Sequence, residues 1–361
     1  MTCVPVTVAS LLPHAWFLNQ PQWLLLLFIV VALVVLVYGA DWLVEAAAAT
    51  AYQLGLPRII VGATIVSLGT TSPEMAVSVL AAWSGNAGLA LGNGVGSIIA
   101  DTGLIFGIGC LMTALPADRF LLSRQGWVQF GSGALLAVAC YALWYAQGDS
   151  ATFGRPLGVL FVVLLVAYLG RSVVWARQQA ELHAITQVTD EHHGHEVHRH
   201  SAWWLLFFGL LGLAMVVLGG EVMVQSASEL AMRWGVPEVV IAGTLVAMGT
   251  STPELVVGLM SIRKGHPELL VGNVIGADVL NVLFVIGFAA LAAPLPLTEP
   301  GASWPNVFLE LHLPTLIAML VLFRVFIAMA VRRGRFSRWM GAPLVLMYFA
   351  YLVIQWGGSV G

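Results

Sequence analysis

The sequence predicts an all-α polytopic membrane protein with ten transmembrane helices, arranged as two inverted five-helix repeats. Three observations carry this prediction. The 361 residues are 59% hydrophobic and 9% charged, whereas a soluble domain has about 25% charged residues. Ten apolar runs are long enough to span a bilayer, for which a helix needs about 20 residues. Finally, residues 56–107 recur without a gap at 236–287.

The ten apolar runs are divided by one polar stretch at residues 178–200. The first half, 22–177, holds runs at 22–46, 56–84, 88–115, 126–147 and 156–177. The second half, 201–361, holds runs at 202–231, 236–262, 267–293, 307–330 and 339–357. Several runs exceed the thickness of a bilayer, so we expect tilted or broken helices. The expected breaks lie at Pro57, Pro73, Pro237 and Pro253.

The distribution of basic residues predicts how the ten helices are oriented across the membrane. Most of these residues fall in loops on one side of the membrane, while Arg155 and Arg233 fall on the other. By the positive-inside rule, the crowded side is cytoplasmic. We therefore expect both termini, including an N-terminal tail at 1–21, outside the cytoplasm and the stretch 178–200 inside. The compact chain favours a prokaryotic inner (plasma) membrane.

The composition and the cysteines exclude several other classes. The net charge is −3, and nothing in the chain indicates a nucleic acid or an obligate protein partner. Cys3, Cys110 and Cys140 lie in or near apolar segments, so we interpret them as small buried residues and not as a disulfide or zinc framework. No covalent chemistry is indicated, and we expect neither an enzyme nor a cofactor.

The repeat contains the first candidate site. Fourteen of the 52 aligned pairs between 56–107 and 236–287 are identical, and they include the only Pro-Glu steps in mid-span, at Glu74 and Glu254. Five helices separate the two copies, so the second enters the membrane from the opposite side. This is the plan of secondary transporters that bind ions at the midplane.

The residues around each glutamate provide hard oxygen ligands. Thr70 and Thr71 precede Glu74 by four and three residues and share its helix face, and Pro73 frees a backbone carbonyl. In the second copy the equivalent set is Glu254, Thr250, Ser251 and the carbonyls near Ala247. The alternative is a proline kink whose hydroxyls bond back to their own helix. Two inverted copies, each ending in a glutamate, favour ligands for Ca²⁺ or Na⁺.

Further polar residues follow in each copy. Ser97 and Asp101 are spaced i, i+4, Asn281 occupies the position equivalent to Asp101, and Asp278 is a fourth intramembrane acid. An unpaired buried charge is costly, and no Lys or Arg lies at matching depth. A bound cation or protons would supply the missing positive charge.

These motifs resemble the cation/Ca²⁺ exchanger superfamily, and especially its sodium/calcium exchanger branch. The pattern G-T-S-x-P-E followed by G-N-x-x-G-S-N-x-x-[N/D] occurs once per half in that family. The resemblance implies exchange of Ca²⁺ against Na⁺, or in other branches against H⁺ or with K⁺ co-transport. It implies a metal site formed by Glu74, Glu254, Asp101, Asn281, Thr70, Thr71, Thr250, Ser251 and Ser97, with carbonyls of Ser67 and Ala247.

The chain departs from the family pattern at Ile98, Asp101, Ala277, Asp278 and Asn281. The order of amide and acid is reversed at Asp101 and Asn281, and the Ser-Asn step is replaced by Ser97-Ile98 and Ala277-Asp278. These departures leave open whether the coupling ion is Na⁺ or H⁺. They also leave open whether Asp278 faces the site, the backbone or a cavity.

A histidine-rich segment lies in the polar stretch between the halves. It contains His183, His192, His193, His195, His198 and His200. One interpretation is a solvated low-complexity linker. The other is binding of a transition metal or sensing of pH.

We thus expect an antiporter in the lipid bilayer that exchanges Ca²⁺ for Na⁺ by alternating access, with a Ca²⁺/H⁺ antiporter as the alternative. A channel with the same acids as a selectivity ring is a rival from another class. An intramembrane protease is a weaker rival. Such an enzyme would use two aspartates as a catalytic pair, and the Pro-Glu repeats would have no role in it.

Overall fold

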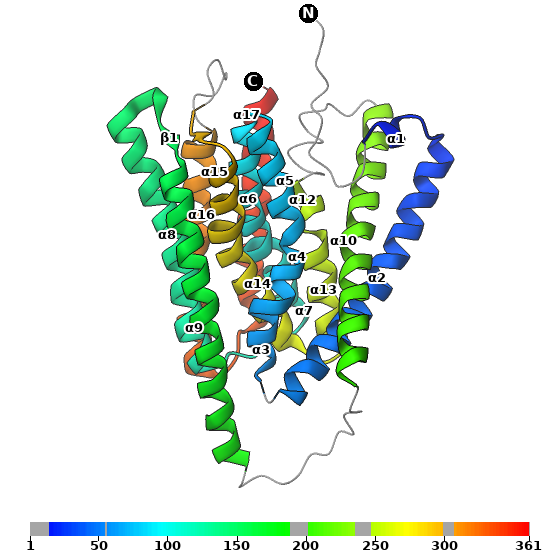
Figure 1. Cartoon of the computed structure of the whole chain (residues 1–361), viewed down its shortest axis with the longest axis vertical. Coiled ribbons are helices and arrows are strands. Elements are labelled where there is room, and N and C mark those ends of the chain that lie inside the picture. Colours follow the sequence, from blue (N-terminus) through cyan, green and yellow to red (C-terminus); the bar gives the residue numbers. More distant parts are fainter. Residues whose placement is uncertain (1–13, 55, 188–200, 235–246, 299–306, 361) are drawn as a thin grey trace, which may run out of the picture.

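The computed structural model describes residues 14–54, 56–187, 201–234, 247–298 and 307–360. Within these residues, seven helices are long and apolar enough to cross a membrane, and one bent pair gives an eighth candidate. Among the described residues, the regular structure is helical apart from two short paired strands. The chain is therefore an all-α polytopic membrane protein, as predicted (Figure 1).

The first half follows the predicted runs. Its elements are α1 (His14–Leu18), α2 (Gln22–Gln53), α3 (Arg58–Val61), η1 (Gly62–Val66), α4 (Ser67–Thr70), α5 (Ser72–Trp83), α6 (Ala87–Ala100), η2 (Asp101–Phe106), α7 (Gly107–Met112), α8 (Arg119–Gln147), η3 (Gly148–Ser150), β1 (Thr152–Phe153) and α9 (Arg155–Gln187). The segments η1 and η2 are π-helical turns inside longer helices. Each adds a residue to a turn and so changes the direction of the side chains that follow.

The second half has a similar order of elements. They are α10 (Ala202–Arg233), α12 (Ala247–Thr250), α13 (Thr252–Arg263), α14 (Pro267–Leu280), η5 (Asn281–Ile286), α15 (Gly287–Ala292), β2 (Leu295–Pro296), η6 (Phe308–His312), α16 (Leu313–Arg333), η7 (Arg338–Met340) and α17 (Gly341–Val360). The strands β1 and β2 join the two halves through an antiparallel pair.

Both copies of the repeat contain a helix break at the predicted prolines. The helices on either side of Thr71 meet at 41°, and Pro73 lies in the first turn of α5. The second copy breaks at Ser251, and Pro253 lies in the first turn of α13. A proline is tolerated in a first turn because its missing N–H would have no partner there. Of the two other predicted prolines, Pro57 directly precedes α3, and Pro237 lies outside the described residues.

The two copies run in opposite directions through the bundle. In Figure 1, α3–α5 ascends and α6–α7 descends, whereas α12–α13 descends and α14–α15 ascends. The element α1 and the C-terminal end of α17 lie at the same end of the molecule. The arrangement brings the two broken helices side by side near the centre.

The helices α2 and α10 form a pair at one side of the bundle (Figure 1). Glycines allow their backbones to approach closely. A Cβ atom on Gly39 would lie 2.9 Å from the carbonyl oxygen of Gly212, and one on Gly212 would lie 2.7 Å from that of Gly39. Such small-residue contacts are the usual way for transmembrane helices to pack tightly.

A second close contact fixes α14 against the first broken helix. A Cβ atom on Gly272 would lie 2.0 Å from the carbonyl oxygen of Ile59, and one on Gly276 would lie 2.3 Å from that of Ala63. Any side chain at these positions would push the helices apart. The contact therefore determines how near α14 comes to the polar turn at Ser67.

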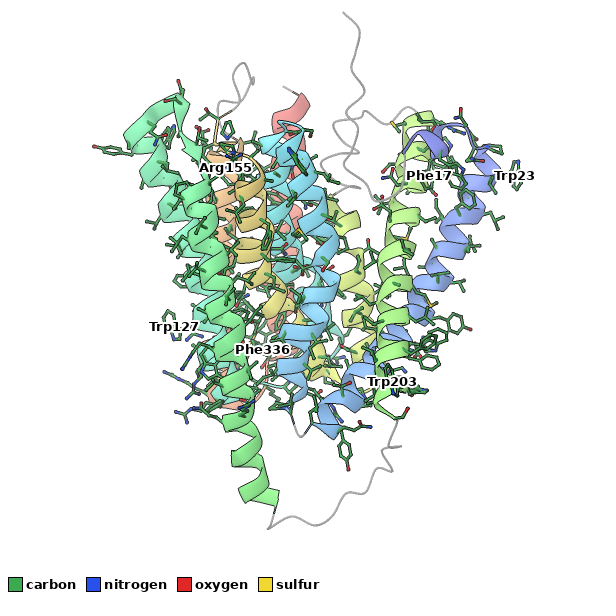
Figure 2. The ribbon with its side chains drawn as sticks, viewed as in Figure 1. Phe17, Trp23, Trp127, Arg155, Trp203 and Phe336 are labelled. Atoms are coloured by element: carbon green, nitrogen blue, oxygen red, sulfur yellow. The ribbon has the colours of Figure 1, made fainter. Side chains whose placement is uncertain are left out.

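Exposed tryptophans lie near the two ends of the bundle. Trp23 lies near one end, and Trp127 and Trp203 lie towards the other (Figure 2). Tryptophans are enriched at the two membrane interfaces. This placement is consistent with helices that cross the bilayer roughly along the long axis of the molecule.

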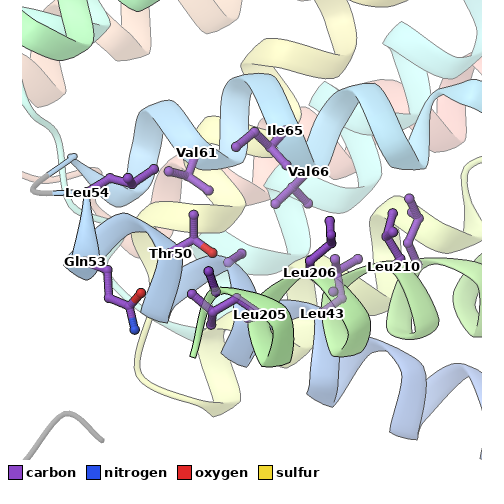
Figure 3. A pocket seen from close by; sticks show the side chains of 15 residues that line it. Leu43, Thr50, Gln53, Leu54, Val61, Ile65, Val66, Leu205, Leu206 and Leu210 are labelled. Carbon is purple, nitrogen blue, oxygen red and sulfur yellow. The ribbon is translucent and has the colours of Figure 1, made fainter. Parts of the chain in front are cut away.

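A cavity of about 370 Å³ lies between α2, η1 and α10 (Figure 3). Its lining is apolar except for Thr50 and Gln53 near one end. The residues that line it are Leu43, Ala46, Ala47, Thr50, Gln53, Leu54, Val61, Ile65, Val66, Ala202, Leu205, Leu206, Gly209, Leu210 and Leu213. The predicted ion ligands lie elsewhere, so this cavity is not the ion site.

Candidate cation site

The two glutamates of the Pro-Glu steps are buried inside the bundle, within electrostatic range of each other. Glu74 and Glu254 each lie in the first turn of the helix that follows a break, where the helix dipole favours a negative charge. Each is 1% exposed. The hydroxyl of Thr71 donates a hydrogen bond to Oε1 of Glu254 across the repeats, at 3.3 Å. Glu74 in turn lies within electrostatic range of Glu254 and Asp101.

The residues of the second predicted pair lie in contact. Asp101 begins the π-turn η2 and Asn281 begins the π-turn η5. Both are buried, and the side-chain amide of Asn281 lies 3.4 Å from Oδ2 of Asp101. π-turns occur frequently at functional sites. The reversed acid and amide therefore occupy neighbouring positions in space.

Several buried oxygen atoms at this site have no hydrogen-bond partner among the described residues. They are both carboxylate oxygens of Glu74, Oε2 of Glu254, Oδ1 of Asp101, Oδ1 of Asn281, and the hydroxyls of Ser97 and Ser251. A buried carboxylate without a partner is strongly unfavourable. Carboxylate, hydroxyl and amide oxygens together are the donor set that hard cations such as Ca²⁺ prefer.

The site differs from a transition-metal centre. Within the described ranges, no group of three or more His, Cys, Asp or Glu side chains is close enough to hold a metal ion by itself. Hydroxyl and amide oxygens have to complete any coordination shell here. The oxygen donors at this site differ from the imidazole and thiolate ligands that Zn²⁺ and Cu²⁺ take.

Two asparagines that we did not predict as site residues tie the copies together. The hydroxyl of Thr250 lies 3.1 Å from Oδ1 of Asn93, and that of Thr70 lies 3.5 Å from Oδ1 of Asn273. These contacts are equivalent under the repeat. Asn93 also donates to the hydroxyl of Ser78 at 3.0 Å. The identity of Asn93 and Asn273 in the repeat was the one signal in the sequence.

The predicted carbonyl ligands lie at the beginning of short helices. Ser67 begins α4, and its carbonyl accepts hydrogen bonds from the N–H of Thr71 at 2.8 Å and from the hydroxyl of Thr70 at 3.4 Å. The Ser67 hydroxyl donates to the carbonyl of Asn273 at 2.9 Å. Ala247 begins α12. The assignment of these carbonyls as ligands stays a prediction.

Asp278 is also buried, and its contacts are with other residues than the ligands above. Its Oδ2 accepts hydrogen bonds from the hydroxyl of Thr102 and from the side-chain amide of Gln129, each at 2.5 Å. Gln129 lies on α8, outside the repeat. No pattern in the sequence indicated this contact, because a single glutamine in a long helix carries no distinctive signal.

The histidine-rich segment falls largely outside the described residues. This holds for His192, His193, His195, His198 and His200. His183 belongs to α9, and its side chain is also outside the described part. Both interpretations of this segment therefore stay predictions.

Known proteins match this chain along most of its length. The family model described as "Sodium/calcium exchanger protein" matches residues 24–174 and 203–357. The chain is 30% identical over 350 residues to the sodium/calcium exchanger MaX1 of Methanosarcina acetivorans, covering 91% of this chain and 97% of that one. It is 32% identical over 268 residues to the inner membrane protein YrbG of Escherichia coli, covering 74% and 79%.

The fold is similar to that of a solved exchanger. The structure of the sodium-calcium exchanger NCX_Mj soaked with Na⁺ and Sr²⁺ matches with a TM-score of 0.74 and 25% identity. The match covers 92% of this chain and 99% of that chain. Similarity thus extends over both halves.

Proposed function

Because the chain belongs to the sodium/calcium exchanger family, we propose that it exchanges Ca²⁺ for Na⁺ by alternating access at one central site. It is a transporter and not an enzyme. One observation carries the proposal. Two buried glutamates from oppositely directed copies lie within electrostatic range of each other, and a bound cation or protons would compensate their unpartnered oxygens.

The proposed architecture has ten spans in two inverted five-helix halves, 22–177 and 201–361. The opposite directions of the two repeat copies support it (Figure 1). We also propose that both termini are extracytoplasmic and that the histidine-rich segment is cytoplasmic. The likeness to an inner membrane protein of E. coli supports a prokaryotic inner membrane.

In the proposed mechanism, Ca²⁺ and Na⁺ compete for the same buried charges. Glu74, Glu254 and Asp101 provide the negative charges, and the neighbouring hydroxyls together with the Asn281 oxygen complete the shell. The site without a cation would hold uncompensated charges in a low dielectric, which is unfavourable. The protein therefore crosses between its two open states with a cation bound, and this enforces exchange.

The pair of α2 and α10 is the proposed moving part. Its two helices are locked together at Gly39 and Gly212, while an apolar cavity separates part of the pair from η1. A rigid pair next to a cavity can slide along the other helices without breaking its own contacts. Such sliding would expose the central site to each side in turn.

Lys264 connects this moving pair to the rest of the bundle. It follows α13 and lies 3.0 Å from Oδ1 of Asp41 and 3.0 Å from Oε2 of Glu45, both on α2. We expect Lys264→Gln to weaken closure on the cytoplasmic side. The probe is a cysteine that replaces the buried Met260, which packs against α2. In the Lys264 variant this cysteine should react with a membrane-impermeant maleimide up to about fivefold faster. An exposed ion pair contributes up to about 1 kcal/mol, which sets this limit.

The matched control is Arg58→Gln. Arg58 pairs with Glu268 at 3.4 Å, which joins α3 to α14 and leaves α2 untouched. All variants are made in a background without Cys3, Cys110 and Cys140. Equal labelling rates in the Lys264 and Arg58 variants would show that the ion pair does not hold α2 in place.

A flux assay tests the proposed function. Purified protein is reconstituted into liposomes, and uptake of ⁴⁵Ca²⁺ is measured with a Na⁺ gradient or a pH gradient imposed separately. We expect uptake driven by internal Na⁺, with matching Ca²⁺-dependent Na⁺ efflux. Uptake driven only by the pH gradient would support the Ca²⁺/H⁺ alternative, which the reversed Asp101 and Asn281 and the additional Asp278 favour. Ca²⁺ entry without counter-flux would indicate a channel.

A further inference from the structure

We propose that Asp278 is a fixed negative charge beside the ion site that increases its preference for a divalent over a monovalent cation. This inference rests on the proposed exchange of Ca²⁺ for Na⁺. In it, Asp278 acts on the bound ion through space and does not belong to the coordination shell. The site formed by equivalent residues of the two copies gives Asp278 no role, and this proposal assigns one.

Oδ2 of Asp278 accepts two hydrogen bonds, whereas its Oδ1 is buried without a hydrogen-bond partner among the described residues. The residue is 1% exposed, and two neutral donors, Thr102 on η2 and Gln129 on α8, are both directed at its Oδ2. Hydrogen bonds donated to the charged form of an acid favour that form. Among the described residues, no Lys or Arg side chain pairs with Asp278. Its charge is therefore available to a cation in the site.

The cluster of Asp278, Thr102 and Gln129 has no counterpart related by the repeat. In the gapless repeat, Asp278 is equivalent to Ile98, and Thr102 is equivalent to Val282. The acid and its hydroxyl donor are thus both replaced by apolar residues in the other copy. By contrast, the central ligands Glu74 and Glu254 occupy equivalent positions in the two copies. The cluster therefore adds charge to a symmetric site without being one of its paired ligands.

The cluster is close enough to act on the central ion. Thr102 follows Asp101 directly in η2, and Asp278 lies one helical turn before Asn281. Asp278 is also within electrostatic range of Asp101. The interaction energy between two charges is proportional to the charge of each. A fixed anion outside the shell consequently stabilises Ca²⁺ by about twice as much free energy as one Na⁺.

This proportionality gives a quantitative test with Asp278→Asn, which removes the charge and keeps the size. Binding of Ca²⁺, and its displacement by Na⁺, are measured by calorimetry on the purified full-length protein. If the Na⁺ dissociation constant, obtained from the displacement after correction for competing Ca²⁺, rises by a certain factor, the Ca²⁺ dissociation constant should rise by about the square of that factor. We expect the dissociation constant to rise roughly threefold for Na⁺ and roughly tenfold for Ca²⁺.

Two further variants separate charge from shape. Asp278→Glu keeps the charge and should keep the ratio of the two affinities. Ser132→Ala removes another buried hydroxyl on α8, one that bonds to the carbonyl of Gln129 at 2.9 Å, and should leave the ratio unchanged.

Several outcomes would overturn the inference. Unchanged affinities in Asp278→Asn would mean that the residue carries no charge that the ion senses. Equal factors for both ions would indicate a purely structural role. Loss of all detectable Ca²⁺ binding would make Asp278 a direct ligand. If the unaltered protein bound neither ion, the proposed function itself would fail, which is a distinguishable result.

Discussion

Glu74→Gln and Glu254→Gln are each expected to reduce Na⁺-driven Ca²⁺ uptake by about 100-fold or more. Both carboxylates are buried at the meeting point of the two repeat copies, and each would supply a full charge to one cation. Removing one member of a buried charged set costs roughly 3–5 kcal/mol, which is a factor of at least about 100 in affinity. Initial rates of ⁴⁵Ca²⁺ uptake into proteoliposomes measure the effect.

The glutamine variants should remain folded. Glutamine has nearly the same shape, and an uncharged side chain is less costly to bury than a carboxylate. A monodisperse gel-filtration peak and an unchanged thermal midpoint without Ca²⁺ would show this. Glu268→Gln is the matched control, because Glu268 lies at the beginning of α14 and pairs with Arg58; it should transport normally. Normal transport by either central variant would refute the site.

Asp101→Asn is expected to lower the apparent affinity for Ca²⁺ by roughly tenfold or more, and addition of Asn281→Asp should partly restore it. The amide of Asn281 lies 3.4 Å from Oδ2 of Asp101. Exchanging the two residues therefore moves one negative charge by only a few ångströms while the total charge stays the same. The double variant also recreates the order of amide and acid that the family resemblance implies.

The measurement is a double-mutant cycle on the Ca²⁺ dependence of uptake. Two residues in contact should show a coupling free energy, whereas independent residues give additive effects. The single variant Asn281→Asp completes the cycle. If the loss caused by Asp101→Asn were the same with and without Asn281→Asp, the two positions would not share one ion.

The buried acids of the candidate site could be predicted from the sequence because charge in a membrane is so unfavourable. Glu74 and Glu254 stand out as acids in apolar runs, and the gapless repeat links each to its own hydroxyls. Pro73 and Pro253 indicated the breaks because a proline cannot continue the hydrogen bonding of a helix interior. These features are local and follow from elementary physical chemistry.

The remaining features depend on contacts between distant segments. Asn93 and Asn273 each accept a hydrogen bond from a threonine hydroxyl of the opposite copy. Only the fold shows which residues are in contact. The π-turns at Asp101 and Asn281 add a residue to a turn without any signature in the hydrophobic pattern. Gln129 approaches Asp278 from a helix outside the repeat. Sequence reasoning therefore found the charges but not all of their partners.

The claim that Glu74 and Glu254 hold one cation between them is tested most directly by calorimetric titration of the purified protein with Ca²⁺. We predict one Ca²⁺ per chain, competitive displacement by Na⁺, and loss of that single site in both Glu74→Gln and Glu254→Gln. Two independent Ca²⁺ ions per chain, with each variant losing only one of them, would contradict the shared site.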